Sequence, residues 1–181
     1  MYPQDVGYIL LKMNIIPGSS VIEAGTGSGC FTQVLATYVG DTGHVFSYES
    51  REEMQKLAQQ NLNRLGLSKR VTFMNRSFEE CFDQNKVNAV FLDLPNPYDH
   101  INQVRSSLIS GRFFGTLLPT TNQVIKTLTA LRRYDFQNID VCEILIRFYQ
   151  AEEMKFRPVD RMVAHTGYLI FARPVIEVKG V

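Results

Sequence analysis

Two periodicities of apolar residues alternate along the chain. Over residues 3–13, apolar side chains recur every three or four positions, as on one face of a helix, until a Pro-Gly pair at 17–18 ends the segment. Ser20–Ala24 is instead a short apolar run that is typical of a buried strand. The same analysis predicts strands at 20–24, 44–48, 71–74, 88–92, 111–118, 139–148 and 166–172, and helices at 3–13, 31–38, 51–65 and 121–131.

The order of these elements indicates the fold class. Strands and helices alternate through most of the chain, which is typical of a parallel sheet with helices on both faces. The last two apolar runs, 139–148 and 166–172, have no clear helix between them, so we expect them to pair as an antiparallel hairpin. The pattern therefore predicts an α/β fold with an antiparallel end.

Length and composition limit the domain count and the class of ligand. The chain has 181 residues, of which 45% are hydrophobic, so we expect one domain. The formal net charge is only +1 and does not by itself indicate a nucleic-acid binder. Residues 1–99 carry 8 Lys/Arg and 11 Asp/Glu, net −3, whereas residues 100–181 carry 11 and 7, net +4. A polyanion should therefore contact the second half.

Cysteine use and the absence of long apolar runs indicate the compartment. Cys30, Cys81 and Cys142 are an odd number, lie far apart and show no metal-ligand spacing, so we expect no metal site and a reducing cytoplasm. The sequence has no unbroken apolar run of about 18 residues and no signal-peptide pattern at its start. We expect a cytoplasmic protein that does not enter the membrane.

A glycine-rich turn follows the first predicted strand. Glycines between a strand and a helix let the backbone approach a ligand closely, and the helix N-terminus offers free N–H groups. A nicotinamide-binding G-x-G-x-x-G motif would need glycine at position 30, where Cys30 stands. The order from Glu23 to Gly29 is E-x-G-x-G-x-G instead. About 20 residues further on, Glu49 ends the second strand, where an acid can accept ribose hydroxyls.

A second candidate segment follows the fourth strand. Asp93 comes directly after the apolar run 89–92 and before a loop that contains Pro95 and Pro97. Ligands of doubly wound sheets bind at the carboxyl ends of central strands, so Asp93 is the candidate reaction centre. The alternative is that Asp93 only caps the loop.

The sequence resembles the tRNA (adenine-58-N1) methyltransferases over nearly its whole length. Each matching stretch is short, but their order and spacing together are specific. In chain order they are Tyr2-Pro3-Gln4-Asp5, Glu23 to Gly29, Tyr48-Glu49 with Arg51, Leu92-Asp93-Leu94-Pro95, Pro119 with Gln123-Val124, Arg157-Pro158, and His165-Thr166-Gly167-Tyr168-Leu169.

This resemblance implies a Rossmann-like class I methyltransferase fold, with a mostly parallel seven-stranded sheet and S-adenosylmethionine (SAM) as the cofactor. It implies direct in-line methyl transfer to adenine N1 in the tRNA T-loop, with Asp93 orienting the adenine amine and Tyr2 contacting the base. The implied cofactor residues are Glu23, Gly25, Thr26, Gly27, Ser28, Gly29, Glu49, Ser50, Arg51, Ser77, Phe78 and Asp93. The implied tRNA residues are Tyr2, Gln123, Arg157, Arg161, His165 and Thr166.

Some expectations remain open at this stage. Ser77 stands where relatives usually carry an acid for the cofactor adenine, so SAM affinity could be lower. Tyr2 could instead anchor the first helix, and the basic residues Arg157, Arg161 and His165 could form an ordinary solvated surface. The family normally has a small β-rich domain upstream, which we expect to be absent from residues 1–181.

The family usually assembles as a homotetramer, so a homo-oligomer is expected. Two other functions remain possible on the sequence alone. One is a methyltransferase of the same fold that acts on a protein carboxylate or a small molecule. The other is a non-catalytic tRNA-binding subunit, although such a subunit should have lost the glycine loop that this chain retains.

Overall fold

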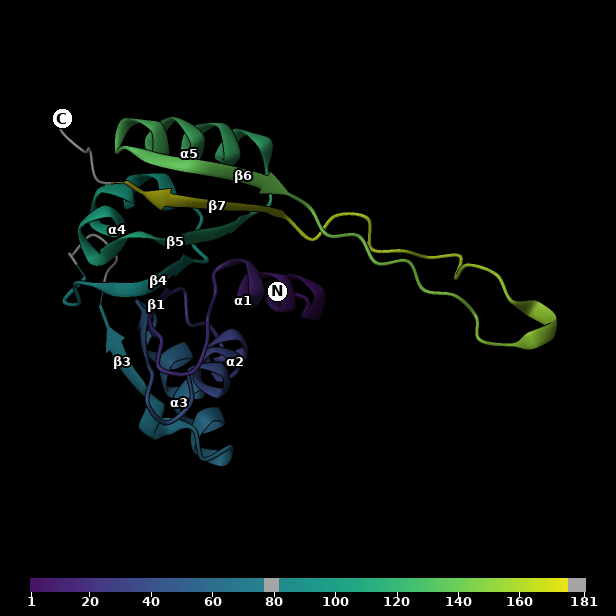
Figure 1. Cartoon of the computed structure of the whole chain (residues 1–181). Coiled ribbons are helices and arrows are strands. Elements are labelled where there is room, and N and C mark those ends of the chain that lie inside the picture. The colour runs from purple at the N-terminus through teal and green to yellow at the C-terminus, as the bar shows by residue number, and fades with distance from the viewer. Residues whose placement is uncertain (77–81, 176–181) are drawn as a thin grey trace.

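A computed structural model describes residues 1–76 and 82–175 and shows a twisted sheet in the order β3-β2-β1-β4-β5-β7-β6 (Figure 1). The pairs formed by β1 to β5 are parallel, whereas β7 is antiparallel to both β5 and β6. This confirms the predicted mostly parallel sheet with an antiparallel end. The strands are β1 Ser20–Ala24, β2 His44–Glu49, β3 Val71–Asn75, β4 Val87–Leu92, β5 Leu108–Leu118, β6 Phe136–Cys142 and β7 Tyr168–Pro174.

Helices cover both faces of the sheet, as predicted. One face packs against α1, α2 and α3, and the other packs against α4 and α5. The helices are α1 Pro3–Lys12, α2 Cys30–Val39, α3 Glu52–Arg64, α4 Ile101–Ser107 and α5 Thr121–Arg133, with short 3-10 turns η1 Ser68–Arg70, η2 Pro97–Asp99 and η3 Glu153–Lys155.

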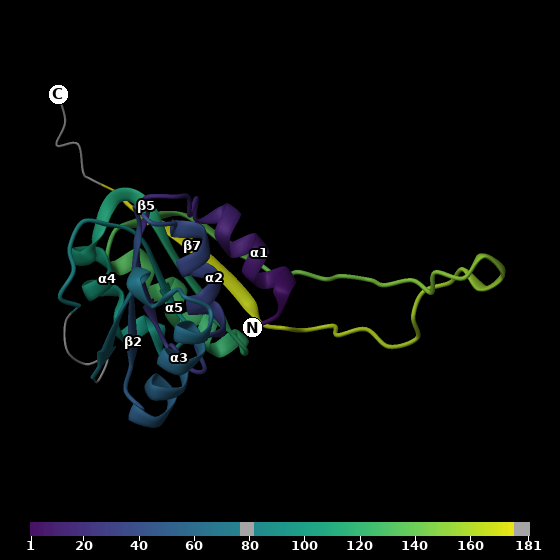
Figure 2. The same cartoon turned by 90° about the horizontal axis from the view of Figure 1, so that it is seen from below.

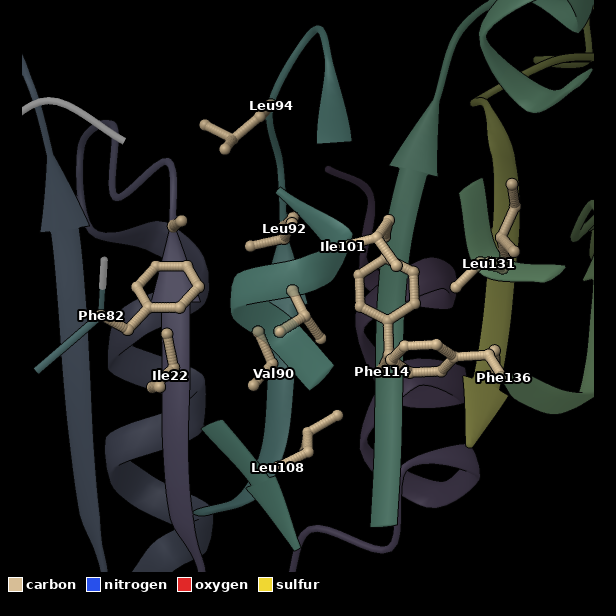
Figure 3. Packing of buried hydrophobic residues seen from close by; sticks show 14 of the residues in the cluster. Ile22, Phe82, Val90, Leu92, Leu94, Ile101, Leu108, Phe114, Leu131 and Phe136 are labelled. Atoms are coloured by element: carbon tan, nitrogen blue, oxygen red, sulfur yellow. The ribbon is translucent and has the colours of Figure 1, made fainter. Parts of the chain in front are cut away.

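Alternation along the central strand creates these two cores. In β4, Val90 and Leu92 belong to the cluster under α4 and α5, whereas Ala89 and Phe91 belong to the cluster under α1 to α3. All four are buried, so this strand is apolar on both sides. Figure 3 shows the first of these clusters, which spans the sheet from Phe82 to Phe136.

The C-terminal hairpin differs from its prediction in its boundaries. The apolar run 139–148 predicts the strand, but β6 begins at Phe136, whose ring packs edge-on against Phe114 at 6.0 Å between centroids. It ends at Cys142, since the later apolar residues do not pair with the sheet. The short helix α4 was also not predicted, because its seven residues are too few for a clear helical period.

A long arm, residues 143–167, joins β6 to β7 and projects from the body (Figures 1 and 2). Its two sides are linked by an isolated antiparallel bridge between Tyr149 and Pro158, and the rings of Tyr149 and Phe156 stack at 5.3 Å. Large apolar side chains on the arm face solvent, with Phe148 70% and Met154 95% exposed. The predicted hairpin is therefore correct in its pairing, but the connection is an extended arm.

The start of the chain is joined to the base of the arm. Asp5 of α1 is fully buried and accepts hydrogen bonds from the Thr166 hydroxyl at 3.0 Å and the Tyr2 backbone N–H at 3.3 Å. Because a buried carboxylate without partners would be costly, these bonds fix the entry of α1 against the arm. Two separated stretches of the family resemblance thus meet in space.

Within the described ranges, no helix has the length and apolarity needed to cross a membrane, and no group of three or more His, Cys, Asp or Glu residues is placed to hold a metal ion.

Candidate functional site

The candidate site lies where the strand order reverses. From β1 the chain continues outward to β2 on one side, whereas β4 pairs with the other side of β1 and leads on to β5. Loops after β1 and β4 must therefore diverge, which opens a crevice at their carboxyl ends. The structure brings three predicted elements to this edge: the loop Gly25–Gly29, Glu49 at the end of β2, and Asp93 after β4.

Gly25 touches the loop that contains Asp93. A Cβ atom on Gly25 would lie 2.3 Å from the carbonyl oxygen of Asp93, a distance that no side chain could occupy, and the residue has a φ of +95°. The backbone N–H of Asp93 donates to the carbonyl of Ala24 at 2.8 Å. The glycine loop and the candidate reaction centre are therefore in direct backbone contact.

Gly27 and Gly29 differ in their surroundings. A Cβ on Gly29 would press on Ala58 of α3 at 3.0 Å, so that glycine is required by packing. A Cβ on Gly27 would meet nothing within 4 Å, and its φ is +54°. The middle of the loop thus faces open space, as expected where a ligand passes over it.

Glu49 is held at the crevice by the loop itself. Its carboxylate accepts hydrogen bonds from the Gly27 N–H at 2.9 Å and from the Arg51 side chain at 3.0 Å. Burial acts to raise the pKa of Glu49, but the bonds from Arg51 and Gly27 outweigh it and leave the pKa below its ordinary value. Glu49 is therefore an ionised acceptor at neutral pH.

Glu23 lies beneath the loop and is only 1% exposed. One of its carboxylate oxygens accepts hydrogen bonds from Thr32 of α2 and Ser47 of β2, both at 2.6 Å, and Ser47 also bonds Thr26 at 2.6 Å. Burial raises the pKa of Glu23 to about 7, while the two hydroxyl donors oppose the shift. Glu23 thus supports the loop from below, through its bonds to Thr32 and Ser47.

Three hydrogen bonds fix the segment around Asp93. Besides the bond to Ala24, the buried Thr116 hydroxyl donates to the carbonyl of Leu92 at 2.6 Å, and the Gln123 amide donates to the carbonyl of Pro95 at 2.8 Å. Gln123, predicted as a tRNA contact, therefore has its amide engaged inside the protein.

The Asp93 side chain is exposed at this edge of the sheet. Desolvation by the surrounding loop raises the pKa of its carboxyl, and the positive α-amino group of Met1 partly opposes that shift.

Tyr2 faces the arm. Its side chain is 47% exposed and lines a pocket of about 390 Å³ with Gln4, Phe148, Arg161 and Val163. The structure thus brings together Tyr2 and Arg161, which the sequence assigns to substrate contact.

The other predicted tRNA residues are spread along the arm. Arg157 lies near the tip and pairs with Asp160 at 2.6 Å. At the base, His165 contacts Glu143 through Nδ1 at 2.6 Å and the Pro119 carbonyl through Nε2 at 3.1 Å. These bonds, led by the one to Glu143, raise the pKa of His165. Thr166 donates to Asp5. Among the predicted tRNA residues of the arm, Arg157 and Arg161 are exposed guanidinium groups, of which Arg157 is the one paired with Asp160.

The remaining predicted cofactor residues are partly described. Ser28 and Ser50 are exposed beside the loop and the end of β2, whereas Ser77 and Phe78 lie outside the described residues. The sequence analysis missed Ser47 and Thr116, which orient the two loops. Their signal was available, because each is a small polar residue between two non-polar neighbours within a strand.

Comparison with known proteins decides the family. The profile described as "tRNA methyltransferase complex GCD14 subunit" matches residues 1–157. The chain belongs to this family. The resemblance drawn from the motifs is thereby confirmed, and the enzyme class is that of the family, a tRNA methyltransferase.

Relatives and solved structures agree with this assignment. The chain is 34% identical to the tRNA (adenine(57)-N(1)/adenine(58)-N(1))-methyltransferase TrmI of Methanocaldococcus jannaschii, covering 96% of this chain and 71% of that protein. It spans only 53% of the Dictyostelium discoideum catalytic subunit trmt61a, at 29% identity over 88% of this chain.

Among solved structures, TrmI from Aquifex aeolicus superposes with a TM-score of 0.90 at 42% identity, over 97% of this chain and 70% of that one. A protein from Thermotoga maritima described as a SAM-dependent O-methyltransferase superposes at 0.96 with 44% identity, over 99% of this chain and 68% of that one. Both confirm the Rossmann-like methyltransferase fold.

Replacing the buried acid Glu23 should change how stability depends on pH. Because folding raises its pKa from 4.5 to about 7, wild-type stability falls as pH rises through that window and levels off above it. This pKa shift means that ionisation of Glu23 destabilises the folded state by roughly 3 kcal/mol. In Glu23→Gln, the free energy of unfolding relative to wild type should therefore increase by up to that amount between these pH values. Urea denaturation at several pH values measures this difference in unfolding free energy. A difference that does not change with pH would contradict the raised pKa of Glu23.

Filling the open space at Gly27 should block the cofactor. Gly27→Val places a side chain over the loop, so we expect SAM affinity to fall at least about 10-fold, equivalent to ~1.4 kcal/mol. Gly66→Val is the matched control, since Gly66 has a similar φ of +69° and equally open surroundings but ends α3 away from the crevice. Calorimetric titration with SAM should show the loss only in Gly27→Val. Equal losses in both variants would attribute the effect to backbone strain alone.

Proposed function

We propose that this protein transfers a methyl group from SAM to N1 of adenine 58 in the tRNA T-loop. Membership of a tRNA methyltransferase family and the likeness to TrmI proteins support the reaction and the substrate. The observation that carries the proposal is the direct contact between the glycine loop at Gly25 and the backbone of Asp93. This contact puts a cofactor-binding loop and an exposed carboxyl group at the same crevice.

The described residues fit SAM as the cofactor. The space over Gly27 leaves room for the ligand, and the ionised Glu49 can accept hydrogen bonds from ribose hydroxyls. Glu49 also accepts from Arg51 and Gly27, so its orientation is set before a ligand arrives. When bound, SAM supplies the electrophilic methyl group of its sulfonium. The protein's contribution is to align this group in line with the adenine nitrogen.

Asp93 acts on the acceptor base in this proposal. Ring N1 has an in-plane lone pair, so it needs no base before it attacks, but methylation leaves the adenine cationic. A carboxylate that accepts a hydrogen bond from the exocyclic amine orients the ring and favours the developing positive charge. The bonds that Asp93, Thr116 and Gln123 make in this loop hold the backbone that carries the carboxylate in place. Asp93 can then take a proton from the acidified amine.

Tyr2 and the arm provide the proposed substrate surface. The pocket beside Tyr2 combines an aromatic face with the guanidinium of Arg161, a pairing suited to a base and a neighbouring phosphate. Arg157 further along the arm adds a second outward charge. His165 and Thr166 serve mainly to fix the base of the arm, since both make hydrogen bonds within the protein.

We also propose a homo-oligomer in the cytoplasm, with a tetramer as the family's usual assembly. Near its tip the arm exposes Met154 and Phe156, which are 95% and 71% accessible, and a second copy of the chain offers equivalent apolar surfaces to cover them. Free Cys30 and Cys142 are consistent with a reducing compartment.

A second candidate function is O-methylation by the same fold, because the Thermotoga maritima structure bears that description. The loop Gly25–Gly29 would serve either reaction, so the cofactor site does not discriminate between them. A non-catalytic subunit is disfavoured by the intact glycine loop, Glu49 and Asp93.

Nucleoside analysis tests the proposal directly. Unmodified tRNA is incubated with the protein and SAM, digested, and examined by mass spectrometry, and we expect 1-methyladenosine to appear. A transcript with uridine at nucleotide position 58 should yield none. The O-methylation alternative predicts methyl transfer to a carboxylate or small molecule with no methylated nucleoside.

Asp93→Ala should lower the turnover number about 100-fold or more, the scale expected for losing a positioned acid–base and charge-stabilising group. SAM binding should stay within about twofold, because the carboxyl group is proposed to face the base. Asp41→Ala serves as the control. Asp41 is an exposed carboxylate that pairs with Arg70, and it lies in the turn before the amino end of β2, away from the crevice. Equal loss of SAM binding and turnover in Asp93→Ala would contradict the assigned role.

A further inference from the structure

Helix α5 carries a concentration of positive charge that the proposed site does not use. Its residues Thr121–Arg133 include Lys126, Arg132 and Arg133 and contain no Asp or Glu. The inward side of the helix is apolar, with Val124 and Leu131 buried, so the cations lie on its outward side. The helix therefore presents a net charge of +3 to solvent.

These charges are not neutralised by neighbouring acids. In the part of the chain that the structure describes, several basic residues elsewhere form ion pairs, such as Lys56 with Glu52 and Arg70 with Asp41. Lys126 and Arg133 instead lie over aromatic rings, at 5.2 Å from the centroid of Tyr98 and 5.7 Å from that of Tyr134. A cation on an aromatic face keeps its donors available to an external anion.

A groove runs between the cations and the rings. It has a volume of about 430 Å³ and is lined by α5 from Ile125 to Arg133, by Tyr134, and by Tyr98 and Asp99 of η2. Asp99 is the one acid in this lining, and its carboxylate accepts a hydrogen bond from the Asn96 amide at 2.8 Å. Basic side chains and partly exposed tyrosine rings in one groove match the phosphate groups and the sugar or base groups of a nucleic acid.

The groove is connected to the candidate reaction centre through one segment of the chain. Its residue Tyr98 lies five positions after Asp93 in the same loop, and α5 is fixed to that loop by the bond from Gln123 to Pro95. A nucleotide chain that places a base at Asp93 must leave the crevice along one of its walls. The wall formed by α5 carries Lys126 and Arg133, and neither forms an ion pair within residues 1–76 and 82–175.

We propose that the α5 groove binds the sugar-phosphate backbone of the tRNA substrate next to the target adenine, with Lys126 and Arg133 contacting phosphates and Tyr98 supporting a ribose or base. This inference rests on the proposed function and adds a second tRNA surface to the arm. Because phosphate contacts release counterions, each one contributes about one unit to the slope of log affinity against log salt.

The test compares two double variants that each remove two positive charges. Lys126→Ala with Arg133→Ala changes the groove, whereas Lys56→Ala with Lys69→Ala changes exposed lysines of α3 and η1 on the other face of the sheet. Binding of unmodified tRNA is measured by fluorescence anisotropy at several salt concentrations, SAM binding by calorimetry, and methyl transfer by steady-state kinetics. Urea unfolding verifies that both variants fold.

We expect the groove variant to bind tRNA at least about 10-fold more weakly, with a salt slope reduced by about two units, one per phosphate contact. Its KM for tRNA should rise with kcat and SAM affinity nearly unchanged, and the control should match wild type. An unchanged salt slope in the groove variant, or an equal change in the control, would contradict tRNA binding by the groove. Suppose that the groove variant shows the expected loss of tRNA affinity and of salt slope, but wild type forms no 1-methyladenosine. The inference about the groove then holds, and the proposed function fails.

Discussion

The contact between Gly25 and the backbone of Asp93 determines how the rest of the site is arranged. The carbonyl of Asp93 lies where a side chain on Gly25 would begin, and the adjacent N–H of Asp93 bonds to Ala24. Only glycine allows the loop after β1 to pass this closely to the loop after β4. The parallel pairing of β1 with β4 brings the two loops to the same edge, and this contact sets the distance between cofactor and acceptor surfaces.

The charges of the molecule are separated in a way that suits two different ligands. Glu23, Glu49 and Asp93 gather at the crevice, and the negative charges of the last two help to raise the pKa of Glu23. Such a site favours a ligand that carries positive charge, as a sulfonium does. Lys126, Arg132 and Arg133 of α5 and Arg161 of the arm lie instead in the second half of the chain, which carries the net positive charge. We therefore propose that a polyanionic substrate is held by surfaces that flank the acidic crevice rather than by the crevice itself.

The sequence predicted the parts that depend on local pattern. The glycine loop, Glu49 and Asp93 could be placed because each follows a strand with a clear apolar period, and the strand ends of a parallel sheet share one edge. The arm could not be predicted, because its apolar residues, such as Phe148, read as the continuation of a strand. The partners of Gln123 and Thr166 depend on tertiary packing between distant segments, so the sequence did not reveal that both make hydrogen bonds within the protein.

The central claim is that one backbone contact couples the cofactor loop to the reaction centre, and Gly25→Ala tests it most directly. The added Cβ must displace the Asp93 carbonyl, and the left-handed backbone adds strain of ~1–2 kcal/mol. Gly18→Ala controls for strain, because Gly18 has a φ of +88° and its Cβ would meet only Thr42 at 3.6 Å. SAM affinity and methyl transfer to tRNA should be measured for both variants. The account predicts that Gly25→Ala loses both together while Gly18→Ala keeps both, and wild-type turnover in Gly25→Ala would contradict it.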